Sequence, residues 1–374
     1  MPVYLVTALL ATLLCFFACR VRQRLPAGIS LKERGHRREI VLFWVLVIGS
    51  ALPYVLVSGF RYDVGTDYFF TYEPLMCLIR DGMLQPGQRV EPAFMLLCEA
   101  AVFFGKGITW VMLLSTVITV LFFWLAFYGE SDIPWLSVFL LAGARPFFIS
   151  MNCVRQYMGM AIVLFAFRFI KEKCFWKYAL CVGVAALFHV SVLILLPLYF
   201  VRYLQLNPLL GGGLLALSFL LKTPLMALMR FVVSKTPYAE YIGTVYDSVP
   251  PTYPEKFWAM LPLLVVVSVY YFVGENRKDP LFRVFYLCQL GVMFFTLNRN
   301  IIPLAERVSW MLEMPQLLLV PMLIHREPGR RKKILIAALL LGSLLWLTWY
   351  EIFKNGYHEV VPYRCVFFPE LGIL

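Results

Sequence analysis

The sequence has few charged residues for its length. Only 15% of its 374 residues are Asp, Glu, Lys or Arg, whereas 61% are hydrophobic. A soluble globular domain carries about 25% charged residues, so this composition excludes one. Apolar runs of about 18 residues or more recur along the chain, and a run of that length can cross a bilayer as a helix. The sequence therefore predicts an all-α, polytopic integral membrane protein.

Metal-binding and disulfide patterns are also missing. The nine cysteines lie mostly inside apolar runs without a C-x-x-C pair, and only four histidines are present. Zinc sites and disulfide frameworks need such residues at short, regular spacings. We therefore expect packed cysteines and no metal site. No internal repeat is visible, which counts against a transporter built from two related halves.

The net charge of +12 comes largely from basic residues in short loops between the apolar runs. Lys and Arg concentrate in cytoplasmic loops of membrane proteins, so the charge indicates topology and not a nucleic-acid partner. No positive charge precedes the first apolar run, residues 2–19, as it would in a signal peptide, and a basic loop over residues 20–38 follows it. We expect an external N-terminus and a cytoplasmic basic loop.

The apolar runs predict about ten full spans in one transmembrane domain that covers residues 1–374. The expected spans are residues 2–19, 40–58, 107–128, 134–149, 153–170, 176–199, 257–273, 281–297, 303–324 and 334–350. Residues 93–104 are too short to cross, and residues 207–235 are interrupted by glycines and Pro224. Such segments line cavities in membrane folds, so both are expected to be re-entrant. The long external segments are about 59–92 and 235–256.

A polar pattern stands at the expected outer end of the 153–170 span. Asn152, Arg155, Gln156 and Gly159 are spaced so that one helix would present them on one face. Arg155 alone is compatible with an arginine that extends to lipid headgroups. That alternative does not account for the aligned amides and glycine, which favour an inward-facing polar cluster.

Three further groups are candidates. The first external segment carries Arg61, Asp67 and Tyr68, although its aromatic residues also suit an interfacial belt. His189 lies inside the expected 176–199 span, where a lone histidine is more often a packed core residue. The last group surrounds the 303–324 span and contains Arg299, Glu306, Arg307 and Glu313. Glu306 and Arg307 alone are equally compatible with a neutralised interfacial pair, but an intramembrane carboxylate such as Glu313 suggests function.

Taken in order, these short motifs resemble the EpsG family of Wzy-type bacterial polysaccharide polymerases. The motifs are Arg61 with Gly65-Thr-Asp-Tyr68, Glu91-Pro92, Asn152-Cys-Val-Arg-Gln156, Leu187-Phe-His189 and Glu306-Arg307. The resemblance covers about residues 60–325. It implies a fold similar to lipid-dependent (GT-C-like) glycosyltransferases and O-antigen ligases.

The activity that the resemblance implies is polymerisation of exopolysaccharide or capsule at the outer face of the bacterial cytoplasmic membrane. The growing chain on undecaprenyl pyrophosphate would pass to a newly flipped lipid-linked repeat unit, with no cofactor. The implied partners are undecaprenyl-pyrophosphate-linked oligosaccharide, membrane lipid, and the flippase and chain-length or export proteins of the same pathway. No nucleic acid is expected.

This chemistry suggests roles for the candidates. A pyrophosphate leaving group needs cations, and guanidinium matches phosphate oxygens best, which points to Arg155, with Arg61, Arg299 and Arg307. The acceptor hydroxyl needs a general base, for which Asp67, His189 and Glu306 are candidates. Asp67 is preferred to His189 because it lies in the external segment. Tyr68, Asn152 and Gln156 are expected to bind substrate.

Three alternatives stay open at the level of sequence. A lipid-linked oligosaccharide flippase would also be basic and polytopic, but its charges should line a cavity open to both faces. An O-antigen ligase-like transferase or an acyltransferase shares the chemistry and is poorly separated by sequence. A purely structural scaffold of an export complex would need none of the aligned polar residues.

Overall fold

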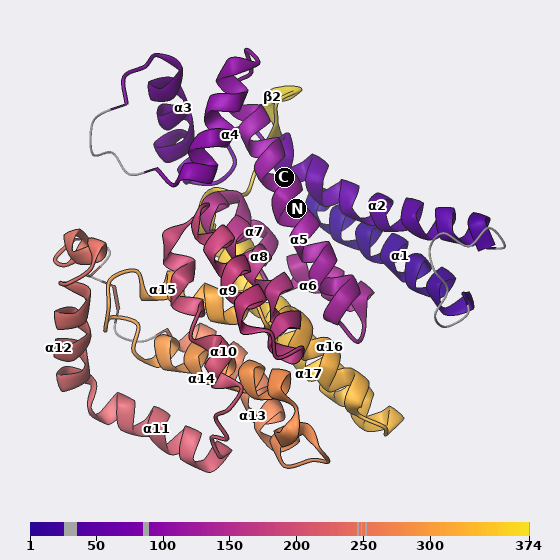
Figure 1. Cartoon of the computed structure of the whole chain (residues 1–374), viewed down its shortest axis with the longest axis vertical. Coiled ribbons are helices and arrows are strands. Elements are labelled where there is room, and N and C mark those ends of the chain that lie inside the picture. The colour runs from indigo at the N-terminus through magenta and orange to yellow at the C-terminus, as the bar shows by residue number, and fades with distance from the viewer. Residues whose placement is uncertain (26–35, 85–89, 245–246, 248, 251–252, 374) are drawn as a thin grey trace. The chain divides into compact units, whose positions relative to one another are not determined.

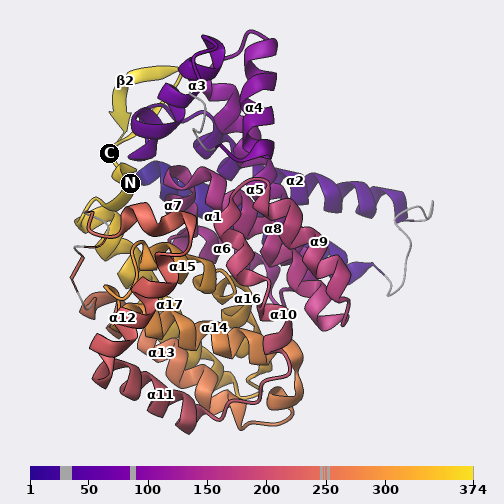
Figure 2. The same ribbon diagram turned by 60° about the vertical axis from the view of Figure 1, so that its left-hand side comes forward.

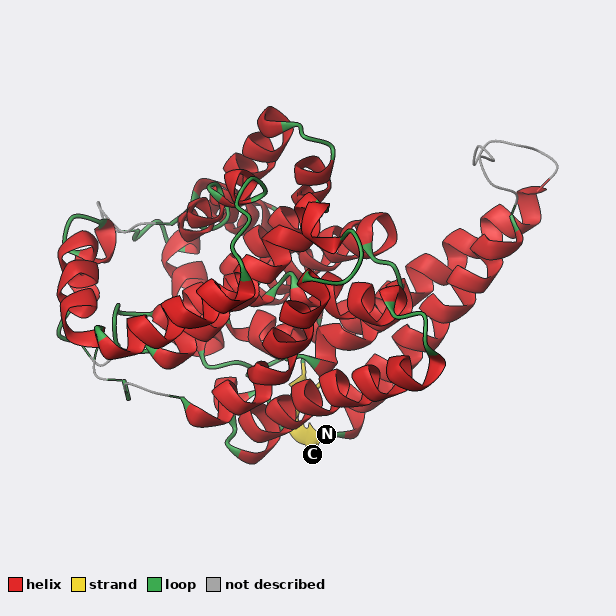
Figure 3. Ribbon diagram, turned by 90° about the horizontal axis from the view of Figure 1, so that it is seen from below, coloured by secondary structure: helices red, strands yellow, loops and turns green. Residues whose placement is uncertain are grey.

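The computed structural model describes residues 1–25, 36–84, 90–244, 247, 249–250 and 253–373. These residues are mainly helical, with one small two-stranded sheet near the C-terminus (Figure 3). The basic loop over residues 20–38 falls partly outside the described residues, as do parts of both predicted external segments. The chain forms two compact units. The first unit is Met1–Phe169, Trp176–Ile194 and Thr348–Leu374, and the second is Ile170–Phe175 and Leu195–Leu347.

The helices of the N-terminal half are α1 (Pro2–Arg24), α2 (Arg37–Gly59), α3 (Glu73–Arg80), α4 (Pro92–Phe103), α5 (Ile108–Glu130), α6 (Pro134–Gly143), α7 (Pro146–Asn152), α8 (Val154–Lys171) and α9 (Phe175–Ala186). Those that follow are α10 (Leu198–Val201), α11 (Pro208–Leu220), α12 (Lys222–Val233), α13 (Pro254–Tyr271), α14 (Pro280–Leu297), α15 (Ala305–Glu313), α16 (Gln316–Arg326) and α17 (Arg330–Thr348). Strands β1 (Tyr363–Cys365) and β2 (Phe368–Ile373) pair antiparallel. Figure 1 labels these elements along the chain. Many of the helices begin at proline, which is favoured at the first helical position because the missing N–H would have no partner there.

The first unit contains a close antiparallel pair formed by α1 and α2 (Figure 2). The buried face of α1 carries Ala8, Ala11, Cys15 and Ala18, spaced alternately three and four residues apart. Small residues at this spacing allow membrane helices to approach closely, because no bulky side chain separates the backbones.

Six helical segments are long and apolar enough to cross a membrane, or up to eight if each bent pair is one span, among the residues that the structure describes. The six are α1, α2, α5, α14, α15 with α16, and Arg330–Lys354. The expected count of about ten is therefore too high. The segment expected over 153–170 is α8, a complete helix with three basic residues, and that expected over 257–273 is α13. A multi-pass helical membrane protein is confirmed.

Two bent pairs depart from straight spans. Between α6 and α7 the chain bends by 54° at Arg145, which has a left-handed φ of 79°. Between α11 and α12 it bends by 86°, which agrees with the predicted irregular region over residues 207–235. The break lies at Leu221, however, and the three glycines at 211–213 continue α11. A helix accommodates glycine at a modest cost, so these glycines were a poor guide to the break.

The prediction of one continuous span over residues 176–199 is wrong. This segment consists of α9, a short 3-10 helix Val190–Leu195 and the single turn α10. The helix ends before His189, which lies in the connection between α9 and the 3-10 helix. The predicted short segment over residues 93–104 is confirmed as an apolar helix, α4, of 12 residues.

Candidate functional site

The polar residues of the first unit gather where its helices are interrupted. The sequence pattern assumed one helix through residues 152–159, but α7 ends at Asn152 and α8 begins at Val154. Cys153 between them has φ −90° and ψ 56°, which is not helical. The expected alignment of Asn152 with Arg155 on one helical face is therefore wrong, although both residues belong to the site.

Tyr72 holds this interruption together. Its hydroxyl accepts a hydrogen bond from the Val154 N–H at 3.0 Å and donates one to the Asn152 carbonyl at 3.2 Å. Backbone groups at a helix break lose their usual partners, and one phenol here replaces two of them. Tyr72, from the segment between α2 and α3, thus fixes the junction between α7 and α8. The sequence pattern did not reveal this contact.

The loop before Tyr68 approaches the same junction closely. Gly65 has a φ of +95°, and a Cβ there would lie 2.7 Å from the carbonyl oxygen of Met151. Only glycine combines this backbone conformation with so close an approach. The neighbouring Asp67 N–H donates to Asn152 Oδ1 at 2.7 Å. Gly65 therefore positions Asp67 against Asn152.

The C-terminal segment closes this arrangement within the first unit. The N–H groups of Gly65 and Thr66 donate to the carbonyls of Glu359 and His358, at 3.1 and 3.2 Å. His358 Nδ1 lies 3.0 Å from Asn152 Nδ2. Because an amide nitrogen only donates, Nδ1 of His358 is the acceptor. The amide of Asn152 therefore joins two segments that are far apart in the sequence.

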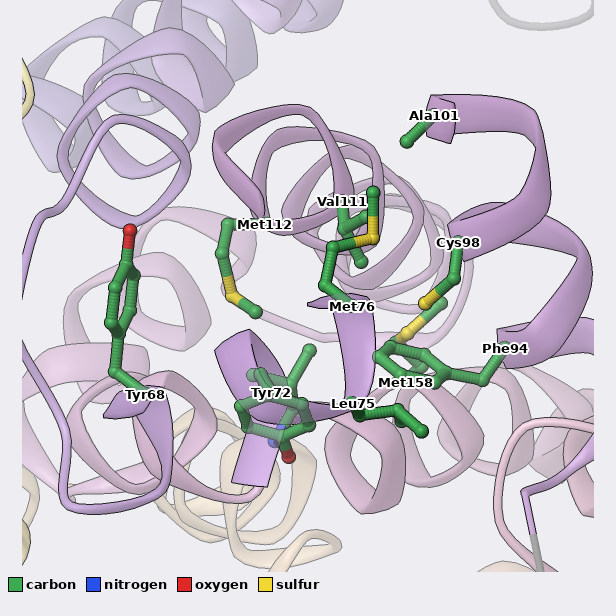
Figure 4. Packing of buried hydrophobic residues seen from close by; sticks show 11 residues of the cluster. Tyr68, Tyr72, Leu75, Met76, Phe94, Cys98, Ala101, Val111, Met112 and Met158 are labelled. Carbon is green, nitrogen blue, oxygen red and sulfur yellow. Dashed lines mark hydrogen bonds between the residues drawn. The ribbon is translucent and has the colours of Figure 1, made fainter. Parts of the chain in front are cut away.

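A buried apolar cluster supports these contacts (Figure 4). It includes Tyr68, Tyr72, Phe94, Met112 and Met158, all nearly inaccessible to solvent. Tyr68 was expected to bind substrate, but its ring packs edge-on against Tyr62 and Phe69 at this site. The cluster joins the segment over residues 68–76 to α4, α5 and α8, so it fixes where the polar side chains at its border can lie.

Glu91 is the centre of the charged group. Its Oε2 lies 2.6 Å from Arg155 Nη1, and its Oε1 lies 2.8 Å from His189 Nδ1. The Arg155 guanidinium also lies over the Phe94 ring, with its carbon 5.6 Å from the ring centre. The backbone bond from Ala93 N–H to the Leu187 carbonyl, 2.9 Å long, holds the start of α4 beside the break that carries His189. Three residues separated by up to 98 positions thus form one continuous group, here called the Glu91 cluster.

Ionisation of Glu91 is favoured by this environment. Burial opposes the charged carboxylate, but the hydrogen bond with His189 and the positive charge of Arg155 outweigh it and lower the pKa of Glu91 to about 2. Glu91 is therefore an anion at neutral pH and can only accept hydrogen bonds.

Gly159 and Gln156 have packing positions on α8. A Cβ at Gly159 would lie 2.9 Å from Val192 Cγ1 and 3.1 Å from the Ala185 carbonyl. The glycine therefore lets α8 approach α9 and the 3-10 helix that follows His189. Gln156 is buried on the same helix.

Arg61 was expected to bind substrate, yet it is only 1% exposed. Its guanidinium donates to the carbonyls of Ser58, Val64 and Met151, the last at 2.9 Å. Arginine with its donors directed at backbone oxygens fixes the chain locally. The placement favours a positioning role for Arg61 between α2, the loop before Tyr68 and α7.

The second unit has its own charged group, here called the Lys256 cluster. Lys256 on α13 is completely buried, and its ammonium lies 2.7 Å from Glu306 Oε1 and 2.5 Å from Glu313 Oε1. Ser309 Oγ accepts from the ammonium at 2.9 Å and donates to Glu313 at the same distance. The carboxylate of Glu313, which the sequence places inside an apolar span, is therefore neutralised by Lys256, 57 positions away.

Arg299 borders the Lys256 cluster. Its Nε lies 3.6 Å from Glu306 Oε2, and its guanidinium lies over the Tyr253 ring at 4.7 Å. Glu306 thus contacts two cations, neither of which is its sequence neighbour Arg307. Arg307 is half-buried on α15.

Glu91 and Lys256 are the two central residues that sequence reasoning did not place among the site residues. Glu91 had a signal, because it belongs to a Glu-Pro motif directly before a short helix. Lys256 had none beyond its position at the start of an apolar run, where lysines commonly extend to the membrane surface. Within the described part of the chain, no group of three or more His, Cys, Asp and Glu side chains is arranged to hold a metal ion.

The fold and both clusters define a class, that of polytopic helical membrane proteins with charged groups at helix breaks and ends. Residues 42–365 match the model of the EpsG family, and the chain belongs to this family. Membership implies a role in exopolysaccharide biosynthesis. No curated protein and no solved structure matches the chain.

Proposed function

We propose that this protein polymerises lipid-linked oligosaccharide repeat units into exopolysaccharide or capsule. The growing chain would be transferred from undecaprenyl pyrophosphate to a sugar hydroxyl of the next repeat unit. The reaction takes place at the outer face of the bacterial cytoplasmic membrane, in a fold related to the lipid-dependent glycosyltransferases. Family membership supports the pathway, and the Glu91 cluster supports the chemistry.

The observation that carries the proposal is the contact of Arg155, Glu91 and His189. A pyrophosphate leaving group develops negative charge as its bond to the sugar breaks, and a fixed cation stabilises that charge. Arg155 has five N–H donors, and the contact to Glu91 involves Nη1. The Tyr72 hydroxyl also interacts with this guanidinium, whose planar fork suits the recognition of phosphate oxygens.

Other residues shape the site. Asn152, with Tyr72 and Gly65, holds Asp67 beside the junction of α7 and α8, where a sugar would meet both backbone and carboxylate groups. Arg299, Glu306 and Arg307 belong to the second unit and are proposed to bind substrate there. The partners proposed are the undecaprenyl-linked oligosaccharide and the flippase and chain-length or export proteins that supply and accept the glycan.

Deletion of the gene tests the proposal. Loss of a polymerase should leave single repeat units on the lipid carrier at the outer face, and plasmid-borne wild-type protein should restore long chains. Single units that accumulate at the inner face would indicate a flippase instead. Normal chain length on the carrier, with loss only of a later transfer, would indicate a ligase.

A further inference from the structure

The Glu91 cluster determines which nitrogen of His189 carries a proton. His189 Nδ1 lies 2.8 Å from a carboxylate oxygen, and an ionised carboxylate only accepts. Nδ1 must therefore be the protonated nitrogen, which leaves Nε2 of the neutral ring with its lone pair. Among the residues that the structure describes, Glu91 is the hydrogen-bond partner of the His189 ring.

We infer that His189 is the general base of the transfer and that Glu91 is its positioning residue, an assignment that rests on the proposed polymerase function. Carboxylate and imidazole form the same orienting pair that hydrolases use to hold a histidine in one tautomer. The position of His189 supports the role, because it lies in a break between α9 and a 3-10 helix and not in a continuous span. Its side chain is 14% exposed, so it is mostly buried but still partly accessible.

The step balances without a further reactant. Nε2 takes the proton of the acceptor hydroxyl while the hydroxyl oxygen bonds to the anomeric carbon of the growing chain. The bond between that carbon and the pyrophosphate oxygen breaks, and its electron pair leaves with undecaprenyl pyrophosphate. The imidazolium that forms is stabilised by Glu91 and then loses its proton to water.

Glu91 has a second contact that strengthens this assignment. Its other oxygen is bound to Arg155 at 2.6 Å, so the carboxylate cannot rotate without losing an ion pair. One carboxylate therefore holds the proposed base and the proposed phosphate-binding cation at a constant separation. The sequence favoured Asp67 as base; its backbone N–H donates to Asn152 Oδ1, and the Asp67→Asn variant below distinguishes the two candidates.

The test uses purified full-length protein in proteoliposomes with lipid-linked repeat units. His189→Ala should lower kcat by roughly 10²- to 10⁴-fold, and added imidazole should restore part of the rate. Glu91→Gln should also lower kcat strongly with little change in KM, and Glu91→Asp should recover part of the loss. His325→Ala on α16 and Glu99→Gln on the exposed side of α4 are matched controls that should retain normal rates.

Two results would overturn the inference. One is a His189→Ala variant that polymerises at a tenth of the normal rate or better. The other is an inactive, correctly folded His189→Ala variant that imidazole does not rescue, together with inactivity of Asp67→Asn, which would make Asp67 the base. Failure of the proposed function itself would look different, because the wild-type protein would then form no polymer in the same assay.

Discussion

Glu91 accepts from a guanidinium and an imidazole through different oxygens, so its protonation should weaken both contacts together. Its pKa of about 2 in the folded protein lies below the ~4.3 of an unfolded glutamate. A depressed pKa contributes stability that is present above the unfolded value and is lost as the pH falls toward the folded value.

We therefore expect a pH-dependent difference between the wild-type protein and Glu91→Gln. The thermal stability of the two proteins in detergent should differ by a constant amount between about pH 7 and 5. The difference should shrink as the pH falls from about 4.3 toward 2. A difference that persists unchanged at pH 2.5 would show that the ionisation of Glu91 does not stabilise the fold.

At Arg155, one substitution can separate the contribution of the positive charge from that of the planar guanidinium shape. Lysine keeps the charge but loses the planar fork that binds phosphate through two oxygens. Arg155→Lys should therefore lower polymer yield at least about tenfold while the amount of protein in the membrane is unchanged. Arg168→Lys, further along α8, is the control. Near-normal polymer chain length in Arg155→Lys would indicate instead that Arg155 only extends to the lipid headgroups.

Lys256 neutralises the buried carboxylate of Glu313 and the half-buried one of Glu306, so its removal should destabilise the second unit. Breaking one side of a buried ion pair costs about 3–5 kcal/mol, and Lys256→Met should show a marked fall in melting temperature. Adding Glu313→Gln to this variant should recover part of the loss, because it removes one unpaired charge. Lys278→Met, in an exposed pair with Glu275, should change little. Equal stability of the two lysine variants would contradict this role.

At the scale of elements, the interruptions between helices create the site. The junction of α7 and α8 exposes backbone groups that Tyr72 binds, and the break after α9 places His189 beside Glu91. A continuous helix satisfies its own backbone and turns its side chains to neighbouring helices or lipid. Breaks at these two points are therefore the reason that polar side chains from distant segments can converge.

Substitution of Gly65 tests whether the close approach of its loop to Met151 and Asn152 matters for the site. Alanine at this position would adopt a left-handed conformation that costs about 1–2 kcal/mol, and its Cβ would clash with the Met151 carbonyl. Gly65→Ala should displace the loop from Asn152, lower the melting temperature and reduce activity. Gly82→Ala is the matched control, since Gly82 also has a positive φ, 67°, but no atom near its missing Cβ. Similar activity losses in both variants would attribute the effect to strain alone.

At the scale of the whole molecule, the distribution of basic loops predicts the sidedness of the candidate residues. We expect Asp67, Arg155, Arg299 and Glu306 on the external side of the membrane, and the basic turns at 277–278 and 326–333 in the cytoplasm. A single cysteine at position 67 in a cysteine-free background should react with an impermeant thiol reagent in intact cells. A cysteine at position 332 should react only after the membrane is opened. The reverse pattern would invert the topology.

The sequence by itself determined that this is a helical membrane protein of the EpsG family, and where most of its helices lie. Apolar length and loop charge are local properties, so they can be read without knowing which segments meet. The sequence also indicated Arg155, His189 and Glu306 as candidate site residues. It misjudged the continuity of the 152–159 helix and of the 176–199 span, because periodicity does not report where a packed neighbour replaces a helical hydrogen bond.

Only the tertiary structure decided which charges are partners. Glu91 pairs with Arg155 and His189, 64 and 98 positions away, and Lys256 pairs with Glu306 and Glu313 across 50 and 57 positions. A charge in an apolar environment is stable only beside its counter-charge, but that requirement does not specify which residue supplies it. The choice depends on the path of the backbone between them, and the breaks at Cys153 and His189 set that path in the first unit.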